Sequence, residues 1–236
     1  MDVDCSNINP ALANILKNPR LNILLDANFL IPPHRSLPKV PRITFSEYEK
    51  IWLIPLFNTF SNLSVHESVY AELVSSEAKN FANNKIESAP QELSVYLNSS
   101  LTPSEKKKFK LYVEQLSPFS QYDPKIPQIT TDKGEIESLG YMAVKGLIYF
   151  ATHDSLPIRL ITKIISDKLG ITSLRALRLY EIIYCLHKLN NGAEGEKLRF
   201  LYRYQYCLTA GEKKQNPAWG EFMRAMDILY SCEENG

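Results

Sequence analysis

The stretch LNILLD at residues 21–26 is a compact apolar run that ends in an aspartate. A short run of this kind is typical of a buried strand in a parallel sheet. A second run, LIYFATHD at residues 147–154, has strand composition and also ends in an aspartate. The sequence therefore predicts two buried strands, each followed by an aspartate.

Helical patterns lie between and after these strands. The sequence predicts a short strand over residues 63–65, a helix that follows DKGE at 132–135 and ends at Gly146, and further helices over residues 10–17, 45–60, 67–81, 157–169 and 173–189. In the helix over 67–81, Val69, Leu73 and Val74 are expected to face the core. Alternating strands and helices predict an α/β fold: a three-layer α/β/α arrangement with a central, mostly parallel sheet and additional helices.

The same pattern suggests a division of the chain. We expect an N-terminal segment over residues 1–19, a core over 20–175 and a C-terminal helical extension over 176–236. The proline-rich region 88–128 reads as an insertion with one or two helices. The aromatics at four-residue spacing in 45–60 are interpreted as core residues.

Composition limits the classes of function. The 27 Lys and Arg residues nearly balance the 26 Asp and Glu residues, for a net charge of +1, so any nucleic-acid surface must be local. The four cysteines, at positions 5, 185, 207 and 232, form no Cys-x-x-Cys pair, and the histidines complete no zinc spacing, so reduced thiols are expected. No secretory signal or long apolar segment is present in the sequence, so we expect a cytoplasmic protein without membrane contact.

The acids form the strongest functional pattern. In an open parallel sheet the functional crevice lies beyond the carboxyl ends of the strands, which is where Asp26 and Asp154 fall. Glu72 and Glu135 lie on helices near such strands, so four carboxylates are expected to converge, and their repulsion requires a cation. Mg²⁺ takes oxygen ligands and keeps several waters, so an acid-only site points to phosphodiester chemistry. Each acid taken alone is equally well a helix cap or a surface residue.

Four segments carry a family resemblance. In order they are LLDANFLI at 24–31, VYAEL at 69–73, DKGEIE at 132–137 and ATHDSL at 151–156. They resemble the four acid-bearing motifs of PIN-domain nucleases, including the toxins of VapBC-type toxin–antitoxin pairs. The resemblance covers roughly residues 20–175. The insertion and the C-terminal extension depart from the compact toxins.

The resemblance implies a metal-dependent endoribonuclease whose cofactor is Mg²⁺ or Mn²⁺. It implies that the catalytic and metal-binding residues are Asp26, Glu72, Glu135 and Asp154. Asn28 and Thr152 would support them by hydrogen bonding, and Glu137 or Asp132 would replace Glu135 as the third acid if the motif is misaligned. The implied partners are single-stranded or structured RNA, an antitoxin or other protein, and a second copy of the chain. The implied roles are toxin, phage-defence effector or RNA-processing enzyme.

Two basic segments are candidates for nucleic-acid binding. The run RFLYRYQY at 199–206 interleaves cations and aromatics as a single-strand surface does, although packing in a core or interface is the favoured interpretation. The lysines at 106–110 either form an edge that contacts the phosphates of a nucleic acid or lie on the solvated face of a helix. The individual candidates are Lys106, Lys107, Lys108, Arg175, Arg178 and Arg203, with Arg175 and Arg178 expected one helical turn apart.

Two other functions compete with the ribonuclease. A non-catalytic PIN-like scaffold that binds a protein partner is favoured if Glu72 or Glu135 points away from the Asp26 and Asp154 pair. A structure-dependent DNA nuclease would use the same metal chemistry, and only a comparison of substrates separates it from the ribonuclease.

Overall fold

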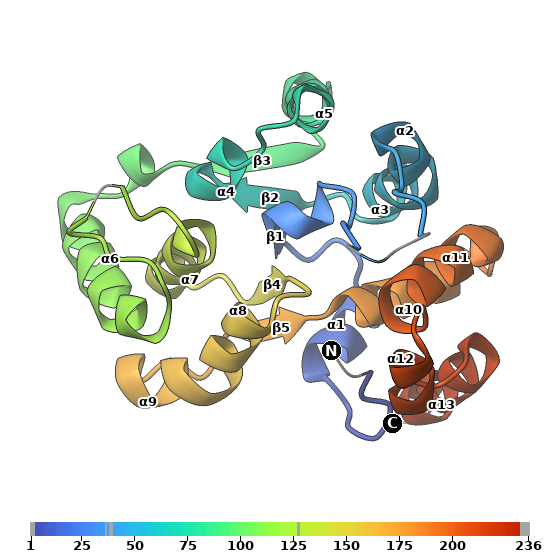
Figure 1. Ribbon diagram of the computed structural model, residues 1–236. Helices are drawn as coiled ribbons and strands as arrows, with labels where there is room; N and C mark the ends of the chain where they lie inside the picture. Colours follow the sequence, from blue (N-terminus) through green and yellow to red (C-terminus); the bar gives the residue numbers. More distant parts are fainter. Residues whose placement is uncertain (1–2, 36, 38–39, 127, 232–236) are drawn as a thin grey trace. The chain divides into compact units, whose positions relative to one another are not determined.

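The computed structural model describes residues 3–35, 37, 40–126 and 128–231 (Figure 1). The chain divides into two compact units. We call Asn22–Pro32 with Asn62–Leu177 the sheet unit, and Met1–Leu21 with Pro33–Ser61 and Arg178–Gly236 the helical unit. The expected division into consecutive segments differs from this one, because residues 33–61 group with the two ends of the chain rather than with the core.

The sheet unit contains five parallel strands in the order β3-β2-β1-β4-β5. Their bounds are Ile23–Leu25 (β1), Leu63–His66 (β2), Leu93–Tyr96 (β3), Tyr149–Ala151 (β4) and Arg175–Leu177 (β5). The chain builds the sheet outward from β1 to β3, then crosses to the other side of β1 for β4 and β5. Leu25 therefore lies opposite Ala151 in the register between β1 and β4. The predicted α/β class with a central parallel sheet, consistent with a three-layer α/β/α fold, is confirmed.

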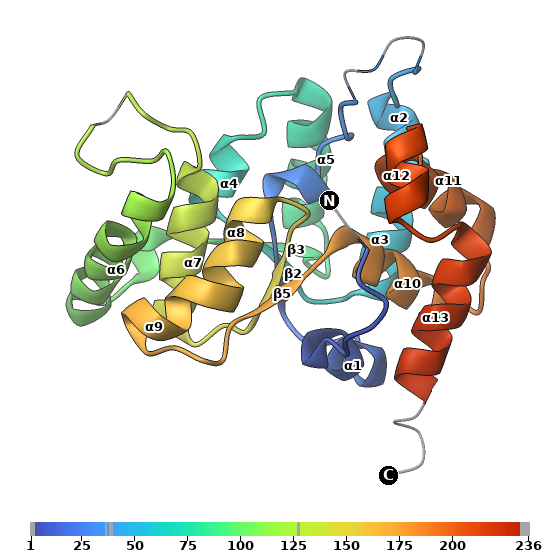
Figure 2. The ribbon, with the colours of Figure 1, turned by 60° about the horizontal axis from the view of Figure 1, so that its bottom comes forward.

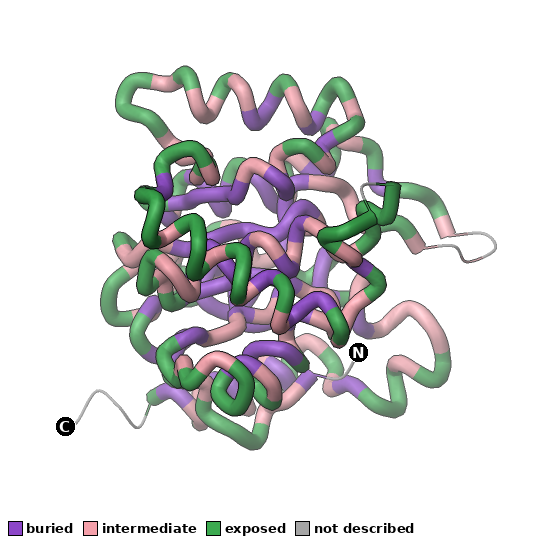
Figure 3. The backbone as a smooth tube through the Cα atoms, turned by 90° about the vertical axis from the view of Figure 1, so that its left-hand side faces the viewer, coloured by how far each residue is buried: buried purple, intermediate pink, exposed green. Residues whose placement is uncertain are grey.

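Helices of the sheet unit pack on this sheet. They are α4 (Glu67–Ala71), α5 (Ser76–Glu87), α6 (Pro103–Leu116), α7 (Lys133–Lys145), α8 (Ser155–Arg159) and α9 (Ile165–Leu169), with a 3-10 turn at Ala27–Phe29. Leu24 of β1 and Phe150 of β4 share a buried cluster with Leu116 of α6, Leu139 of α7 and Ile165 of α9. Figure 2 shows α6, α7 and α9 grouped beside one another, and Figure 3 shows helical stretches of the backbone along which exposed and buried residues alternate. Burial of this apolar surface is the main force that fixes the ends of β1 and β4.

The helical unit has a core rich in aromatic side chains. Its helices are α1 (Pro10–Lys17), α2 (Phe45–Tyr48), α3 (Ile54–Thr59), α10 (Leu179–Leu189), α11 (Gly195–Tyr206), α12 (Ala210–Gln215) and α13 (Trp219–Ser231). A π-helical turn joins α2 to α3. Tyr48 and Trp52 are buried, as predicted for the aromatics of 45–60. Tyr202 and Phe222 stack with ring centroids 4.5 Å apart.

The predicted helix over residues 67–81 is wrong in its middle. The helix stops after Ala71, and a new one begins at Ser76 with Ser75 extended before it. Consecutive serines favour helix starts over helix interiors, because their hydroxyls compete for backbone groups. Leu73 is buried as expected, whereas Val74 is 91% exposed, so the prediction that Val74 faces the core is wrong.

Two strands of the sheet were not predicted. β3 lies inside the expected insertion, where it pairs with β2, and α6 supplies the expected helix there. β5 and α10 replace the single helix predicted over 173–189. Arg175 lies in β5 and Arg178 directly precedes α10, so the two are not one helical turn apart on a helix. The residues of β5, Arg-Ala-Leu, have high helix propensity, and pairing with β4 overrides it.

Several boundaries agree with expectation. The helix over 10–17 is confirmed, and α7 ends at Gly146, whose φ of 68° is the left-handed conformation that glycine tolerates. Among the described residues, Cys5, Cys185 and Cys207 are free thiols, and Cys232 lies outside them. No helix in the described part of the chain is long and apolar enough to cross a membrane.

Candidate metal centre

The candidate site lies where β1 and β4 end side by side. Asp26 follows β1, and its backbone N–H donates to the Ala151 carbonyl at 3.0 Å, which ties the two strand ends together. Thr152 and Asp154 follow β4. The chain order reverses between these two strands, and in open α/β sheets such a reversal opens a crevice beyond the carboxyl ends of the strands.

Three of the four predicted acids meet at this point. Carboxylate oxygens of Asp26, Glu135 and Asp154 all lie within 4.8 Å of one another. Glu135 comes from the first turn of α7, and the two aspartates come from the strand ends. Asp26 is 2% exposed, whereas the other two acids are partly accessible. The cluster thus has a buried floor and an accessible rim.

Short hydrogen bonds hold the two aspartates in place. The Thr152 hydroxyl donates to Asp26 Oδ2 at 2.7 Å and accepts from the Asp154 backbone N–H at 3.0 Å. Asn28 Nδ2 donates to Asp26 Oδ2 at 2.7 Å and to Asp154 Oδ2 at 3.0 Å. The hydrogen bonding predicted for Asn28 and Thr152 is confirmed. Such hydrogen bonds fix the orientation of a carboxylate, as they do for carboxylates that bind metals.

The side-chain oxygen of Asn28 has no donor. Its Oδ1 is buried and makes no hydrogen bond within the described residues, while Nδ2 serves the two aspartates. A buried acceptor without a partner costs about 1–3 kcal/mol. A cation, or a water molecule bound to one, would satisfy this oxygen. The orphan acceptor is thus a second observation, independent of the acids, that fits a cation here.

Glu72 lies beside the three acids rather than among them. It caps the C-terminal end of α4, and its Oε1 accepts a hydrogen bond of 2.9 Å from the backbone N–H of Gly134 in the first turn of α7. The sequence placed Glu72 within a continuous helix, which is wrong. Gly134 was not singled out from the sequence, yet a Cβ at that position would lie 2.4 Å from Glu72 Oε1. The glycine is therefore what lets Glu72 approach the N-terminus of α7.

The acids raise one another's pKa. Burial, then the Glu135 carboxylate, holds the pKa of Asp26 well above its ordinary value. Burial, followed by Glu135, raises the pKa of Glu72 to about 7, and burial also raises the pKa of Glu135. All three carboxyls therefore hold their protons more tightly than isolated carboxyls do. A divalent cation would displace those protons, and its affinity would rise with pH.

The alternative third acids point elsewhere. Glu137 Oε1 accepts from the Tyr122 hydroxyl at 3.0 Å and lies 3.9 Å from Lys133 Nζ. Asp132 Oδ2 accepts from the Gln121 backbone N–H at 2.8 Å. Among these three acids of the DKGEIE segment, Glu135 is the one whose carboxylate reaches Asp26 and Asp154.

The basic candidates are dispersed over several elements. Lys106, Lys107 and Lys108 are exposed on α6. Arg175 Nη1 donates to the Leu174 carbonyl at 2.9 Å, and Arg178 Nη1 donates to the Tyr180 hydroxyl at 2.9 Å. Both arginines therefore have structural roles in their own segments.

Arg203 is exposed on α11, in the segment that interleaves cations and aromatics. The favoured core interpretation of that segment is confirmed for Tyr202, Tyr204 and Tyr206, which are all buried. Phe200, in contrast, is half exposed.

One residue near the acids was not predicted from the sequence to belong to the site. His153 lies between Thr152 and Asp154, with Nε2 3.7 Å from Asp154 Oδ1 and a buried Nδ1 that has no partner among the described residues. Histidines are common as core residues, so the sequence carried no signal that distinguished this one.

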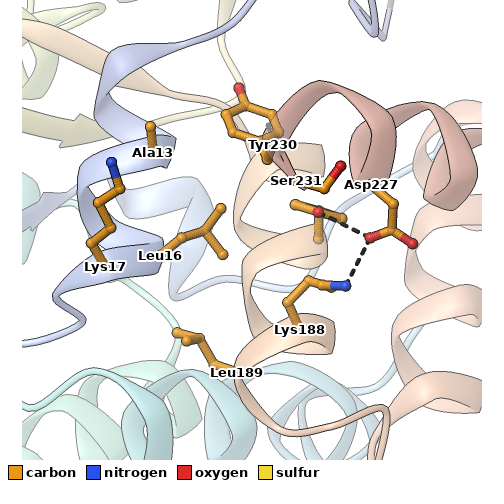
Figure 4. A pocket seen from close by; sticks show the side chains of 9 residues that line it. Ala13, Leu16, Lys17, Lys188, Leu189, Asp227, Tyr230 and Ser231 are labelled. Carbon is orange, nitrogen blue, oxygen red and sulfur yellow. Dashed lines mark hydrogen bonds and ion pairs between the residues drawn. The ribbon is translucent and has the colours of Figure 1, made fainter. Parts of the chain in front are cut away.

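The helical unit contains a separate pocket between α1, α10 and α13 (Figure 4). Its volume is about 390 Å³. Asp227 in its wall accepts from Lys188 Nζ at 2.9 Å and from the Tyr184 hydroxyl at 3.1 Å. This acid is thus neutralised by its neighbours, and the pocket lacks the clustered carboxylates of the candidate metal centre.

The donor set of the candidate metal centre is chemically uniform. Carboxylates and one amide oxygen are hard ligands, and they suit Mg²⁺ or Mn²⁺ better than metals that prefer thiolate or imidazole. A scan against protein-family models found no match, and searches of curated proteins and of solved structures found no similar protein.

Proposed function

We propose that the chain is a metal-dependent endoribonuclease that hydrolyses RNA phosphodiester bonds at the Asp26, Glu135 and Asp154 cluster. The observation that carries the proposal is the meeting of these three carboxylates within 4.8 Å at the ends of β1 and β4. The orphan oxygen of Asn28 supports a cation there. The resemblance of four segments to PIN-domain motifs supports the choice of nuclease chemistry.

Asp26, Glu135 and Asp154 would hold Mg²⁺ or Mn²⁺. When bound, such an ion supplies a Lewis acid for the phosphate oxygens and lowers the pKa of a coordinated water. Asp26 is the fixed anchor of the site, because three hydrogen bonds, from Thr152, Asn28 and Ala27, hold its carboxylate. Glu135 and Asp154 form the accessible rim, where substrate would approach.

Glu72 has a different role in this proposal from that of the three ligands. Its pKa of about 7 suits a group that takes up and releases a proton near neutral pH. With Oε1 held by Gly134, Glu72 is positioned next to Glu135 and is available to accept a proton from an attacking water. A direct metal-binding role for Glu72, which the family resemblance implies, stays a prediction.

A non-catalytic scaffold is the second candidate. The position of Glu72 outside the group of three is the observation that favours it. The presence of Glu135 in the group favours the nuclease, because a scaffold has no need for three buried or half-buried carboxylates within 4.8 Å of one another. A cytoplasmic location, and a role as toxin, defence effector or processing enzyme with a protein partner or a second copy, belong to the same proposal.

The proposal is tested by cleavage of labelled single-stranded RNA and DNA. Each substrate is incubated with Mg²⁺ or Mn²⁺, and wild type is compared with Asp26→Asn and with an EDTA control. We expect metal-dependent cutting of RNA that the variant loses. If the protein cuts only DNA, the substrate is DNA rather than RNA. If neither nucleic acid is cut over varied sequences by folded protein, the scaffold becomes the better account.

A further inference from the structure

Helix α11 has one buried face and one exposed face. Leu201 and Tyr202 are fully buried, whereas Arg199, Phe200 and Arg203 are exposed. Phe200 keeps 50% of its surface exposed, although most aromatic side chains of the described α10–α13 segment are buried. This face therefore presents an aromatic ring between two arginines to solvent, where a ligand can reach all three side chains.

A surface pocket lies over this face. It has a volume of about 510 Å³, within the range of roughly 300–1,000 Å³ typical of small-ligand sites. Residues of α11 and α12, helices shown in Figure 2, contribute to it. The lining includes Arg199, Phe200, Arg203, Tyr204, Leu208 and Lys213. The rings of Phe200 and Tyr204 are adjacent, with centroids 6.1 Å apart.

The pocket carries excess positive charge. Arg199, Arg203 and Lys213 supply three cations, and Glu196 supplies an acid. Glu196 lies 3.6 Å from Arg199 Nη1 with a side chain that is 91% exposed, so it screens Arg199 weakly. Within the described residues, no acid forms an ion pair with Arg203 or Lys213. Two cations beside an exposed ring are therefore available to an anionic ligand.

We propose that this α11 pocket binds single-stranded RNA, with one base against the Phe200 ring and the adjoining phosphates on Arg203 and Lys213. Bases stack on aromatic rings and phosphates pair with Arg and Lys in such surfaces, largely without regard to sequence. An acidic peptide would satisfy the cations but would leave the ring exposed. The choice of RNA rests on the proposed function, whereas the base-and-phosphate chemistry rests on the pocket.

The test is binding of a labelled single-stranded RNA of about 12 nucleotides, measured by fluorescence anisotropy on the full chain in EDTA. EDTA prevents metal-dependent cleavage, so binding is measured apart from catalysis. Phe200→Ala should weaken the Kd roughly 10-fold, because one stacked base is lost. Arg203→Gln should lower the slope of log K against log salt by about 0.7, which is the contribution of one phosphate contact in a single strand.

Two matched variants on α13 serve as controls. Ile228→Ala removes an exposed apolar side chain, and Arg224→Gln removes an exposed cation. Both should bind RNA as wild type does, and circular dichroism should show all four variants folded. Polyglutamate should compete poorly with the RNA, because it offers negative charge without bases.

The inference is overturned if wild type binds no RNA in EDTA, if Phe200→Ala binds like Ile228→Ala, or if polyglutamate competes fully. Its failure differs from failure of the proposed function. Metal-dependent cleavage with no effect of Phe200→Ala on binding would refute the α11 pocket alone. Binding that Phe200→Ala weakens, without cleavage under any metal condition, would refute the nuclease alone.

Discussion

The contact between Glu72 and Gly134 gives a sharp prediction, because the chain provides a matched control. Gly134 is the second residue of α7 and Gly220 is the second residue of α13, and both helices have 13 residues. A Cβ at Gly220 meets nothing within 4 Å, whereas a Cβ at Gly134 lies 2.4 Å from Glu72 Oε1. Alanine at either position gains the same helix propensity, so the difference between the two variants isolates the contact.

The expected magnitudes follow from these distances. Gly220→Ala should raise the free energy of unfolding by about 0.5–1 kcal/mol. Gly134→Ala gains the same amount, but it loses the 2.9 Å hydrogen bond to Glu72, worth about 1 kcal/mol. It also crowds the Glu72 carboxyl, at a further cost of about 1 kcal/mol. The two variants should therefore differ by about 2 kcal/mol.

The assay is urea denaturation followed by circular dichroism at about pH 4, below the ordinary pKa of a glutamate. At higher pH the displaced Glu72 gains free energy by ionising in solvent, because its pKa of about 7 in the site reflects burial and the neighbouring Glu135. The difference between Gly134→Ala and Gly220→Ala should therefore shrink as the pH rises toward 8. Equal stabilisation by both substitutions at about pH 4 would refute the placement of Glu72 against α7.

Three other predictions concern the same structure. Thr152→Val removes the hydroxyl that binds Asp26, so calorimetric titration should show 10–100-fold weaker Mn²⁺ binding, whereas Thr162→Val, at an exposed position of the π-helical turn Leu160–Ile164, should bind as wild type. Burial raises the pKa of Glu181 from 4.5 to about 7, so the unfolded state ionises first and this group alone should lower wild-type stability by about 3 kcal/mol as the pH rises from 4.5 through 7. Urea titrations over that range should show a fall that is smaller by about 3 kcal/mol in Glu181→Gln than in wild type, because Glu72 still titrates in the variant; equal falls in the two proteins would contradict the assignment. Phe222→Ala should cost about 3–5 kcal/mol in the same assay, because the ring is fully buried, and a cost below about 1 kcal/mol would contradict its packing.

The apolar runs before Asp26 and Asp154, together with the alternation of strands and helices, were enough to predict the parallel sheet and the closeness of these two aspartates. Strands buried on both faces are nearly continuous in apolar residues, and those before these two aspartates are so. Hydrogen bonding by Asn28 and Thr152 was implied by the family resemblance, and both side chains do donate to Asp26.

The edge strands β3 and β5 and the position of the Glu72 side chain could not be predicted from the sequence, for physical reasons. β5 is three residues long, and its Arg-Ala-Leu composition favours a helix until β4 pairs with it. β3 is four residues long within a polar, proline-rich region. The position of Glu72 depends on a turn between α4 and α5 and on a hydrogen bond to Gly134, 62 residues away. Such long-range contacts leave no local periodicity.

The most direct test of the metal centre compares two acids of the same helix. Glu135 and Glu137 are both partly buried with raised pKa values, but only Glu135 belongs to the group with Asp26 and Asp154. The measurement is the rate of RNA cleavage in Mn²⁺ by Glu135→Gln and by Glu137→Gln, with wild type and an EDTA control. We expect Glu135→Gln to lose metal-dependent cleavage and Glu137→Gln to keep a rate close to wild type. Equal rates in the two variants, or loss in Glu137→Gln alone, would contradict the assignment of the metal centre.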